Sequence, residues 1–169
     1  ANANWRLWAL AKLGRIDVVL KELRERWAEM PSVAANNAIQ EDWRAEPDSV
    51  SQWSHCAVSP LYVFFMDVAG IRPGAPGFEK CILRPQPGDI DAFDVTARTV
   101  CGPIRVAARK VRGGHDVVVS LPRGVGGELL VPPASDVKLK KLGKIAHLGL
   151  VRYRLPEGAD MSFLLASTP

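Results

Sequence analysis

The stretch that decides the fold is Phe93-Asp-Val-Thr-Ala-Arg-Thr-Val-Cys-Gly-Pro-Ile-Arg-Val-Ala-Ala-Arg109, in which apolar and polar residues alternate around a Gly-Pro turn. Alternation with a period of two places one set of side chains on each face of a β-strand. The pattern recurs toward the C-terminus, between glycine-rich breaks, at residues 117–121, 128–131, 151–155 and 162–165. Many short strands at this spacing predict an antiparallel β-sandwich over residues 80–169.

On the N-terminal side of this stretch the periodicity becomes helical. Arg72-Pro-Gly-Ala-Pro-Gly77 holds four breakers in six residues and predicts a linker over residues 73–79. Before it, apolar residues at helical spacing predict one helix that Gly14 ends and a second from Ile16 to Met30 that Pro31 ends. A third helix is expected from Asp48 or Ser49 to Gly70, kinked by Pro60. The chain is therefore expected to be an α+β protein, with helices over residues 1–72.

Composition limits the classes of partner. The 169 residues carry a net charge of +4, and the excess of basic residues lies in residues 79–169. These charges alternate with apolar residues, as in Val137-Lys-Leu-Lys140, so a solvated strand face is favoured over a nucleic-acid site, which would also show stacking aromatics. The longest apolar run, residues 56–71, is too short and too interrupted to predict a membrane span.

No metal or cofactor is expected from the spacing of potential ligands. Cys56, Cys81 and Cys101 form no CxxC pair, and their odd number indicates buried or free thiols, which slightly favours a reducing compartment such as the cytoplasm. Asp89, Asp91 and Asp94 lack the spacing of a calcium-binding loop and predict a turn. His115 and His147 are expected at the surface.

One polar segment carries the residues of a possible sugar site. Asn36-Asn-Ala-Ile-Gln-Glu-Asp-Trp43 lies between two predicted helices and holds Glu41 and Asp42 beside Trp43, and His55 follows twelve residues later. A carboxylate, an aromatic platform and a histidine are the components of a sugar subsite. On spacing alone the alternative stands that Glu41 caps a helix while Trp43 and His55 fill the core.

A series of short motifs resembles the C-terminal portion of bacterial α-L-rhamnosidases, which are six-hairpin glycosidases. The motifs follow one another in the family's order over about the first 120 residues and fade after Pro122: Leu23-Arg-Glu-Arg-Trp-Ala-Glu-Met30, Ala38-Ile-Gln-Glu-Asp-Trp43, Ser51-Gln-Trp-Ser-His55, Pro60-Leu-Tyr62, Gly70-Ile-Arg-Pro73, Pro76-Gly-Phe78, Pro85-Gln-Pro-Gly-Asp89 and Gly102-Pro-Ile-Arg-Val106. The chain departs from the family at Ala38, where a threonine is usual.

The resemblance implies a fold and a role for three residues. Residues 1–72 would be the closing helices of an (α/α)6 barrel, capped by the β-sandwich. Glu41 resembles the general base of an inverting hydrolase that releases terminal α-L-rhamnose, and Trp43 and His55 resemble sugar-contacting residues. The family's general acid comes from helices that this sequence does not contain, so we expect the chain alone to be inactive. Its expected partners are a rhamnose-containing glycoside and either the remainder of the barrel or a second copy of the chain.

Two other functions stay open at this point. The first is a non-catalytic module that binds carbohydrate or a protein through its helical part. The second is a related exo-glycosidase that acts on a different sugar.

Overall fold

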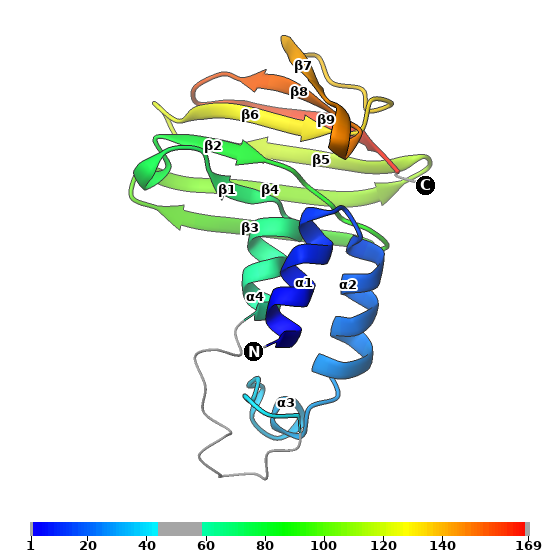
Figure 1. The fold of residues 1–169 in the computed structure, drawn as a ribbon. Helices are drawn as coiled ribbons and strands as arrows, with labels where there is room; N and C mark the ends of the chain where they lie inside the picture. Colours follow the sequence, from blue (N-terminus) through cyan, green and yellow to red (C-terminus); the bar gives the residue numbers. More distant parts are fainter. Residues whose placement is uncertain (1, 44–58, 168–169) are drawn as a thin grey trace. The chain divides into compact units, whose positions relative to one another are not determined.

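A computed structural model describes residues 2–43 and 59–167, which form two compact units that divide between Phe64 and Phe65 (Figure 1). The first unit is helical and the second consists mainly of strands, so the predicted α+β class is confirmed. The domain bounds predicted from the sequence, 1–72, 73–79 and 80–169, stay a prediction. Residues 65–72 lie in the second unit, where residues 71–73 form a strand.

The first unit opens with two helices whose apolar faces form its core. Helix α1 (Asn2–Lys12) is followed by Gly14, whose φ of 82° is the left-handed conformation that favours glycine at a helix end. Helix α2 (Ile16–Glu22) continues as a π-helical turn, η1 (Leu23–Trp27). The apolar residues that these helices bury include pairs at the i,i+3 and i,i+4 spacings of one helix face, such as Leu7 with Ala11 and Ile16 with Val19 and Leu20; the full set is Leu7, Ala11, Ile16, Val19, Leu20 and Trp27.

Pro31 has a different role from the predicted one. The helix ends at Trp27, and Pro31 opens a further helix, α3 (Pro31–Asn36), as its first residue. Proline suits that position because the first N–H of a helix has no acceptor within the helix. The predicted helix start at Asp48 or Ser49 lies outside the described residues. Helix α4 (Ser59–Val63), which holds Pro60, continues as the π-helical turn η4 (Phe64–Val68).

The second unit contains two sheets. The first has the strand order β1 (Ile71–Pro73), β2 (Lys80–Leu83), β6 (Gly126–Val131), β8 (Leu150–Leu155) and β7 (Lys141–Ile145). The second has the order β3 (Ala92–Thr99), β4 (Gly102–Val111), β5 (Gly114–Ser120) and β9 (Asp160–Ala166). Two short 3-10 helices, η5 (Pro76–Phe78) and η6 (Ala146–Leu148), lie between strands.

The two sheets form a sandwich-like unit with an apolar core. Inward positions alternate along the strands, and their side chains are almost fully buried: Val106, Val117, Val119 and Phe163 in one sheet, Leu83, Leu129, Val131 and Leu155 in the other. The described strands pair antiparallel, as predicted, except that β2 and β6 run parallel. Parallel neighbours need a long connection, and here residues 84–125 supply it by forming most of the other sheet.

Candidate functional site

The segment predicted to carry the site begins where helix α3 ends. Asn37 is left-handed, with φ of 52°, and its N–H donates to the Val33 carbonyl at 3.0 Å. The Ala38 N–H donates to the Ser32 carbonyl at 3.3 Å. These bonds satisfy carbonyl groups at the helix end, and the bond from Asn37 to Val33 is that of an αL-type C-cap. The backbone at Ala38 is therefore held although the family's threonine hydroxyl is absent.

Gln40 ties this segment back to the start of the same helix. Its side chain is 1% exposed, its Oε1 accepts a hydrogen bond from the Ser32 backbone N–H at 3.1 Å, and its Nε2 donates to the Asp42 carbonyl at 2.6 Å. A buried amide that is bonded on both sides fixes the backbone around it. Gln40 was not among the residues singled out from the sequence, because the Ser32 N–H and the Asp42 carbonyl that it binds are backbone groups, which no side-chain pattern reveals.

The two acidic residues that follow Gln40 both face solvent. Glu41 and Asp42 are exposed, and neither belongs to a helix or strand. Glu41 is therefore accessible to water, as a general base must be before substrate binds.

Trp43, by contrast, is half-buried and packed on two sides. Its ring meets the Trp27 ring edge-on, with 4.9 Å between centroids and an interplanar angle of 71°. The Arg26 guanidinium lies 4.4 Å from the Trp43 ring centroid, within the range of a cation–π interaction. Trp27 is buried, so Trp43 is attached to the core of the helical unit through a rigid aromatic contact.

Arg26 is itself oriented by a buried carboxylate. Glu22 has a side chain only 8% exposed. It forms ion pairs with Arg6 and with Arg26, the latter with 3.5 Å between Glu22 Oε1 and Arg26 Nη1. The ion pairs explain how Glu22 is tolerated in a buried position.

Two of the three predicted site residues, Glu41 and Trp43, lie two positions apart in the segment after α3, whereas His55 lies outside the described residues. A shared concave face for Glu41, Trp43 and His55 stays a prediction. Within the described ranges, no group of three or more His, Cys, Asp or Glu residues is arranged to hold a metal ion. No helix in those ranges has both the length and the apolar character needed to cross a membrane.

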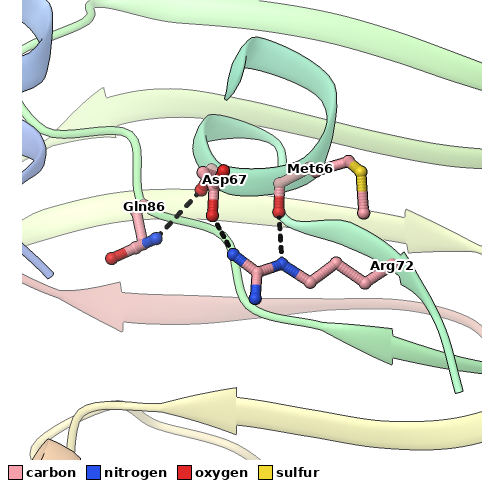
Figure 2. A network of polar contacts seen from close by, with 4 residues as sticks. All are labelled: Met66, Asp67, Arg72 and Gln86. Atoms are coloured by element: carbon pink, nitrogen blue, oxygen red, sulfur yellow. Dashed lines mark hydrogen bonds and ion pairs between the residues drawn. The ribbon is translucent and has the colours of Figure 1, made fainter. Parts of the chain in front are cut away.

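The Gly-Ile-Arg-Pro motif has a structural role in the second unit. Asp67 is completely buried and forms an ion pair with Arg72, whose Nε also donates to the Met66 carbonyl at 2.8 Å (Figure 2). Gln86 Nε2 donates to the Asp67 carbonyl at 3.1 Å. The network therefore joins η4, β1 and the segment after β2. This pair was not predicted from the sequence, because Asp67 and Arg72 lie in different elements, η4 and β1.

Gly70 and Arg84 complete this part of the unit. Gly70 has φ of 74°, and a Cβ there would lie 2.0 Å from the Arg84 carbonyl oxygen, so only glycine fits. Burial, together with the positive charge of Arg72, lowers the pKa of the Arg84 guanidinium. The motif is thus a packing element, and it lies in the unit that does not contain Glu41.

The histidine and cysteine predictions meet different outcomes. His115 is buried in β5, with its Nε2 2.8 Å from the Ile90 carbonyl oxygen, so its expected surface position was wrong. His115 lies on the inward side of β5, together with Val117 and Val119. It was expected at the surface because it follows Gly113 and Gly114. His147 is exposed, and Cys81 and Cys101 are free thiols.

Comparison with known proteins identifies the relatives of this sequence. Residues 70–146 match the family described as bacterial alpha-L-rhamnosidase C-terminal domain, which extends the likeness beyond Pro122. An alpha-L-rhamnosidase of Streptomyces avermitilis is 24% identical over 110 residues, which is 64% of this chain and 10% of the relative. An alpha-L-rhamnosidase of Alteromonas sp. is 26% identical over 137 residues, which is 74% of this chain and 15% of the relative. The chain therefore spans only a small part of the length of these relatives.

Solved structures show the same fold. The crystal structure of Streptomyces avermitilis alpha-L-rhamnosidase complexed with L-rhamnose matches with a TM-score of 0.63 and 20% identity, over 79% of this chain and 14% of that chain. The structure of alpha-L-rhamnosidase from Dictyoglumus thermophilum matches with a TM-score of 0.55 and 22% identity, over 80% and 17% of the two chains. Matches of this extent include residues before Gly70, since the chain from Gly70 onward is shorter than 79% of its length. The resemblance drawn from the motifs is thereby confirmed: this chain is similar to the C-terminal portion of bacterial alpha-L-rhamnosidases.

Proposed function

We propose that this chain contributes the general-base side of the active site of an inverting glycoside hydrolase that releases terminal α-L-rhamnose from glycosides. Glu41 is the base, and Trp43 and His55 contact the sugar. The observation that best supports this proposal is the setting of Glu41, an exposed carboxylate between a buried, doubly bonded Gln40 and a Trp43 that packs on Trp27. Similarity to proteins named alpha-L-rhamnosidase supports the substrate class of this proposal.

The reaction assigns a definite task to Glu41. In an inverting hydrolysis the base takes a proton from a water molecule as that water attacks the anomeric carbon. A second carboxylic acid, roughly 6.5–9.5 Å from the base, protonates the leaving glycosidic oxygen. Asp42 is adjacent to Glu41 in sequence and is poorly placed to approach the opposite side of a sugar ring. The acid in this proposal therefore belongs to the remainder of the catalytic barrel, and the chain alone is inactive.

The proposal is tested with a nitrophenyl α-L-rhamnoside and a protein that joins this chain to the remainder of the barrel. Glu41→Gln is expected to lower kcat by roughly 10²- to 10⁴-fold, the contribution typical of a positioned general base. Asp42→Asn is the matched control, because it removes the neighbouring exposed charge, and it is expected to leave kcat within a few-fold of the starting protein.

Two further measurements complete this experiment: the anomer of the first product and the activity of the chain by itself. NMR of the first product should show β-L-rhamnose, the anomer that inversion produces, and the chain by itself should release negligible nitrophenol. Equal effects of the two substitutions, or robust hydrolysis by the chain alone, would contradict the proposal.

A second candidate function is a module that binds a partner protein or a second copy of itself through the helical unit. Among the described residues of that unit, four large apolar side chains are exposed: Trp5 (65%), Leu13 (71%), Leu61 (59%) and Tyr62 (41%). If these side chains form a contiguous patch, they favour an interaction surface. This candidate is preferred if Glu41→Gln proves to be without effect on hydrolysis.

A further inference from the structure

Gln40 is the one polar residue among the largest fully buried side chains of the described part of the chain; the others are Leu, Ile and Val. Burying an amide without partners costs free energy, so an amide at such a position is expected to satisfy neighbouring backbone groups. The contacts of Gln40 meet this expectation at both ends of its side chain.

The oxygen end of Gln40 completes the start of helix α3. The first N–H groups of a helix have no acceptor within the helix and are usually capped by a side chain of the residue just before it. That residue is Met30, which provides no such side-chain bond. Gln40 Oε1, eight positions after Ser32, accepts from the Ser32 N–H instead. The cap of α3 therefore comes from the loop that leaves the same helix.

The nitrogen end of the Gln40 side chain binds the backbone just after Glu41, at Asp42. Gln40 Nε2 donates to the Asp42 carbonyl oxygen at 2.6 Å. Glu41 therefore lies between a buried residue and a backbone group bonded to that same residue. The two hydrogen bonds of Gln40 thus restrain the backbone on both sides of Glu41.

We propose that Gln40 is a positioning residue that holds the Glu41 carboxylate relative to helix α3 in the catalytic protein. This inference rests on the function proposed above and adds to it the residue that orients the base. A base displaced by about 1 Å loses much of its effect, with losses of up to about 10²-fold, because proton transfer requires near-ideal geometry. Gln40 does not touch the substrate in this assignment and acts only through the loop.

The structural step is tested first, on the chain itself, by amide hydrogen exchange at Ser32. The test variant is Gln40→Met, which keeps the length of the side chain and tolerates burial but removes both hydrogen bonds. Exchange at Ser32 should accelerate by about tenfold, the effect of losing one buried hydrogen bond. The matched control is Gln86→Met, which removes an amide-to-carbonyl bond of the same kind in the other unit and should leave Ser32 unchanged. Unchanged exchange in Gln40→Met would overturn the inference.

The catalytic step is tested in the protein that contains the remainder of the barrel. Gln40→Met should lower kcat by about tenfold or more while KM changes little, because the base acts in the transition state. Gln86→Met should leave both constants unchanged. A fall in kcat of the same size in both variants would mean that Gln40 contributes only stability, and would overturn the inference.

A second variant, Gln40→Glu, supplies a pH-dependent reading. When the new carboxyl group is protonated, it can still accept from Ser32 and donate to Asp42, whereas its ionised form can no longer donate. The ratio of its kcat to that of the unsubstituted protein should therefore fall as the pH rises from about 5 to about 8. A ratio that does not vary with pH would contradict the assigned role. If the unsubstituted protein shows no rhamnosidase activity, the proposed function fails, and the exchange measurement still decides whether Gln40 holds the loop.

Discussion

The buried ion pair between Asp67 and Arg72 gives the sharpest prediction of stability. We consider Arg72→Met, which preserves the long aliphatic part of the side chain and removes its charge. Asp67 is completely buried, and the Arg72 side chain is 18% exposed, so the pair is largely shielded from water. After the substitution the Asp67 carboxylate loses its paired cation, and the Met66 carbonyl loses its hydrogen bond from Arg72.

The expected size follows from this burial. Removing one partner of a buried pair costs about 3–5 kcal/mol, because the other charge remains desolvated. With a urea m-value of about 1–3 kcal/mol/M, the unfolding midpoint of the second unit should fall by at least about 1 M. All five tryptophans lie at or before residue 53, so circular dichroism of the strands is the suitable signal for this unit.

Arg105→Met is the matched control for this experiment. Arg105 and Asp94 also form a paired contact, at 2.8 and 2.6 Å, but their side chains are 43% and 57% exposed. Solvent screens such a pair, so its loss should shift the midpoint far less. Equal shifts in the two variants would refute the reasoning that burial, and not the presence of an ion pair, determines the contribution of Arg72.

Two other expectations concern the cysteines and the apolar surface. Burial raises the pKa of the Cys81 thiol to about 11, so alkylation at pH 8, mapped by mass spectrometry, should modify Cys101 and leave Cys81 intact in the folded protein. For the same reason the folded state should lose stability relative to Cys81→Ala as the pH rises from about 9 toward 11, since the unfolded thiol ionises first. The exposed apolar residues of the helical unit predict self-association, which sedimentation at micromolar concentration should detect and Trp5→Ser with Leu61→Ser should reduce. Val100→Ser, which changes an 89% exposed valine of the other unit, should leave association unchanged, and a monomeric chain would contradict the expectation.

The sequence predicted those strands that are half-buried along their length. Alternation marks β3, β4, β5, β6, β8 and β9 because each presents one face to the core and one to solvent. Strand β1 was not predicted because it ends at Pro73 within a series of breakers, and β2 was not predicted because Lys80-Cys-Ile-Leu83 does not alternate between polar and apolar residues. The parallel pairing of β2 with β6 has no local signal, since periodicity reports burial and not the direction of a neighbour.

The candidate site was predictable only in its chemistry. Glu41 and Trp43 stood out because a carboxylate beside an aromatic residue suggests a sugar subsite. Gln40 and Arg26 did not, because their contacts with Ser32, Asp42 and Trp43 depend on how the chain folds back after helix α3. Residues that orient a site through backbone contacts are, for this reason, harder to find from a single sequence than residues that react.

The parallel pairing of β2 with β6 also has a consequence for the order of folding. Strand β2 pairs on one edge with β1, which is nearby in sequence. Its other edge pairs with β6, residues 126–131, and cannot form those bonds until that segment is present. Contacts between segments so far apart in sequence form slowly, because a long loop must close first. During synthesis, Lys80–Leu83 therefore remains an open strand edge while the chain up to β6 emerges. Strands β3, β4 and β5 of the second sheet lie in the connection between β2 and β6. The first sheet is therefore completed only when this connection, which carries most of the second sheet, has closed.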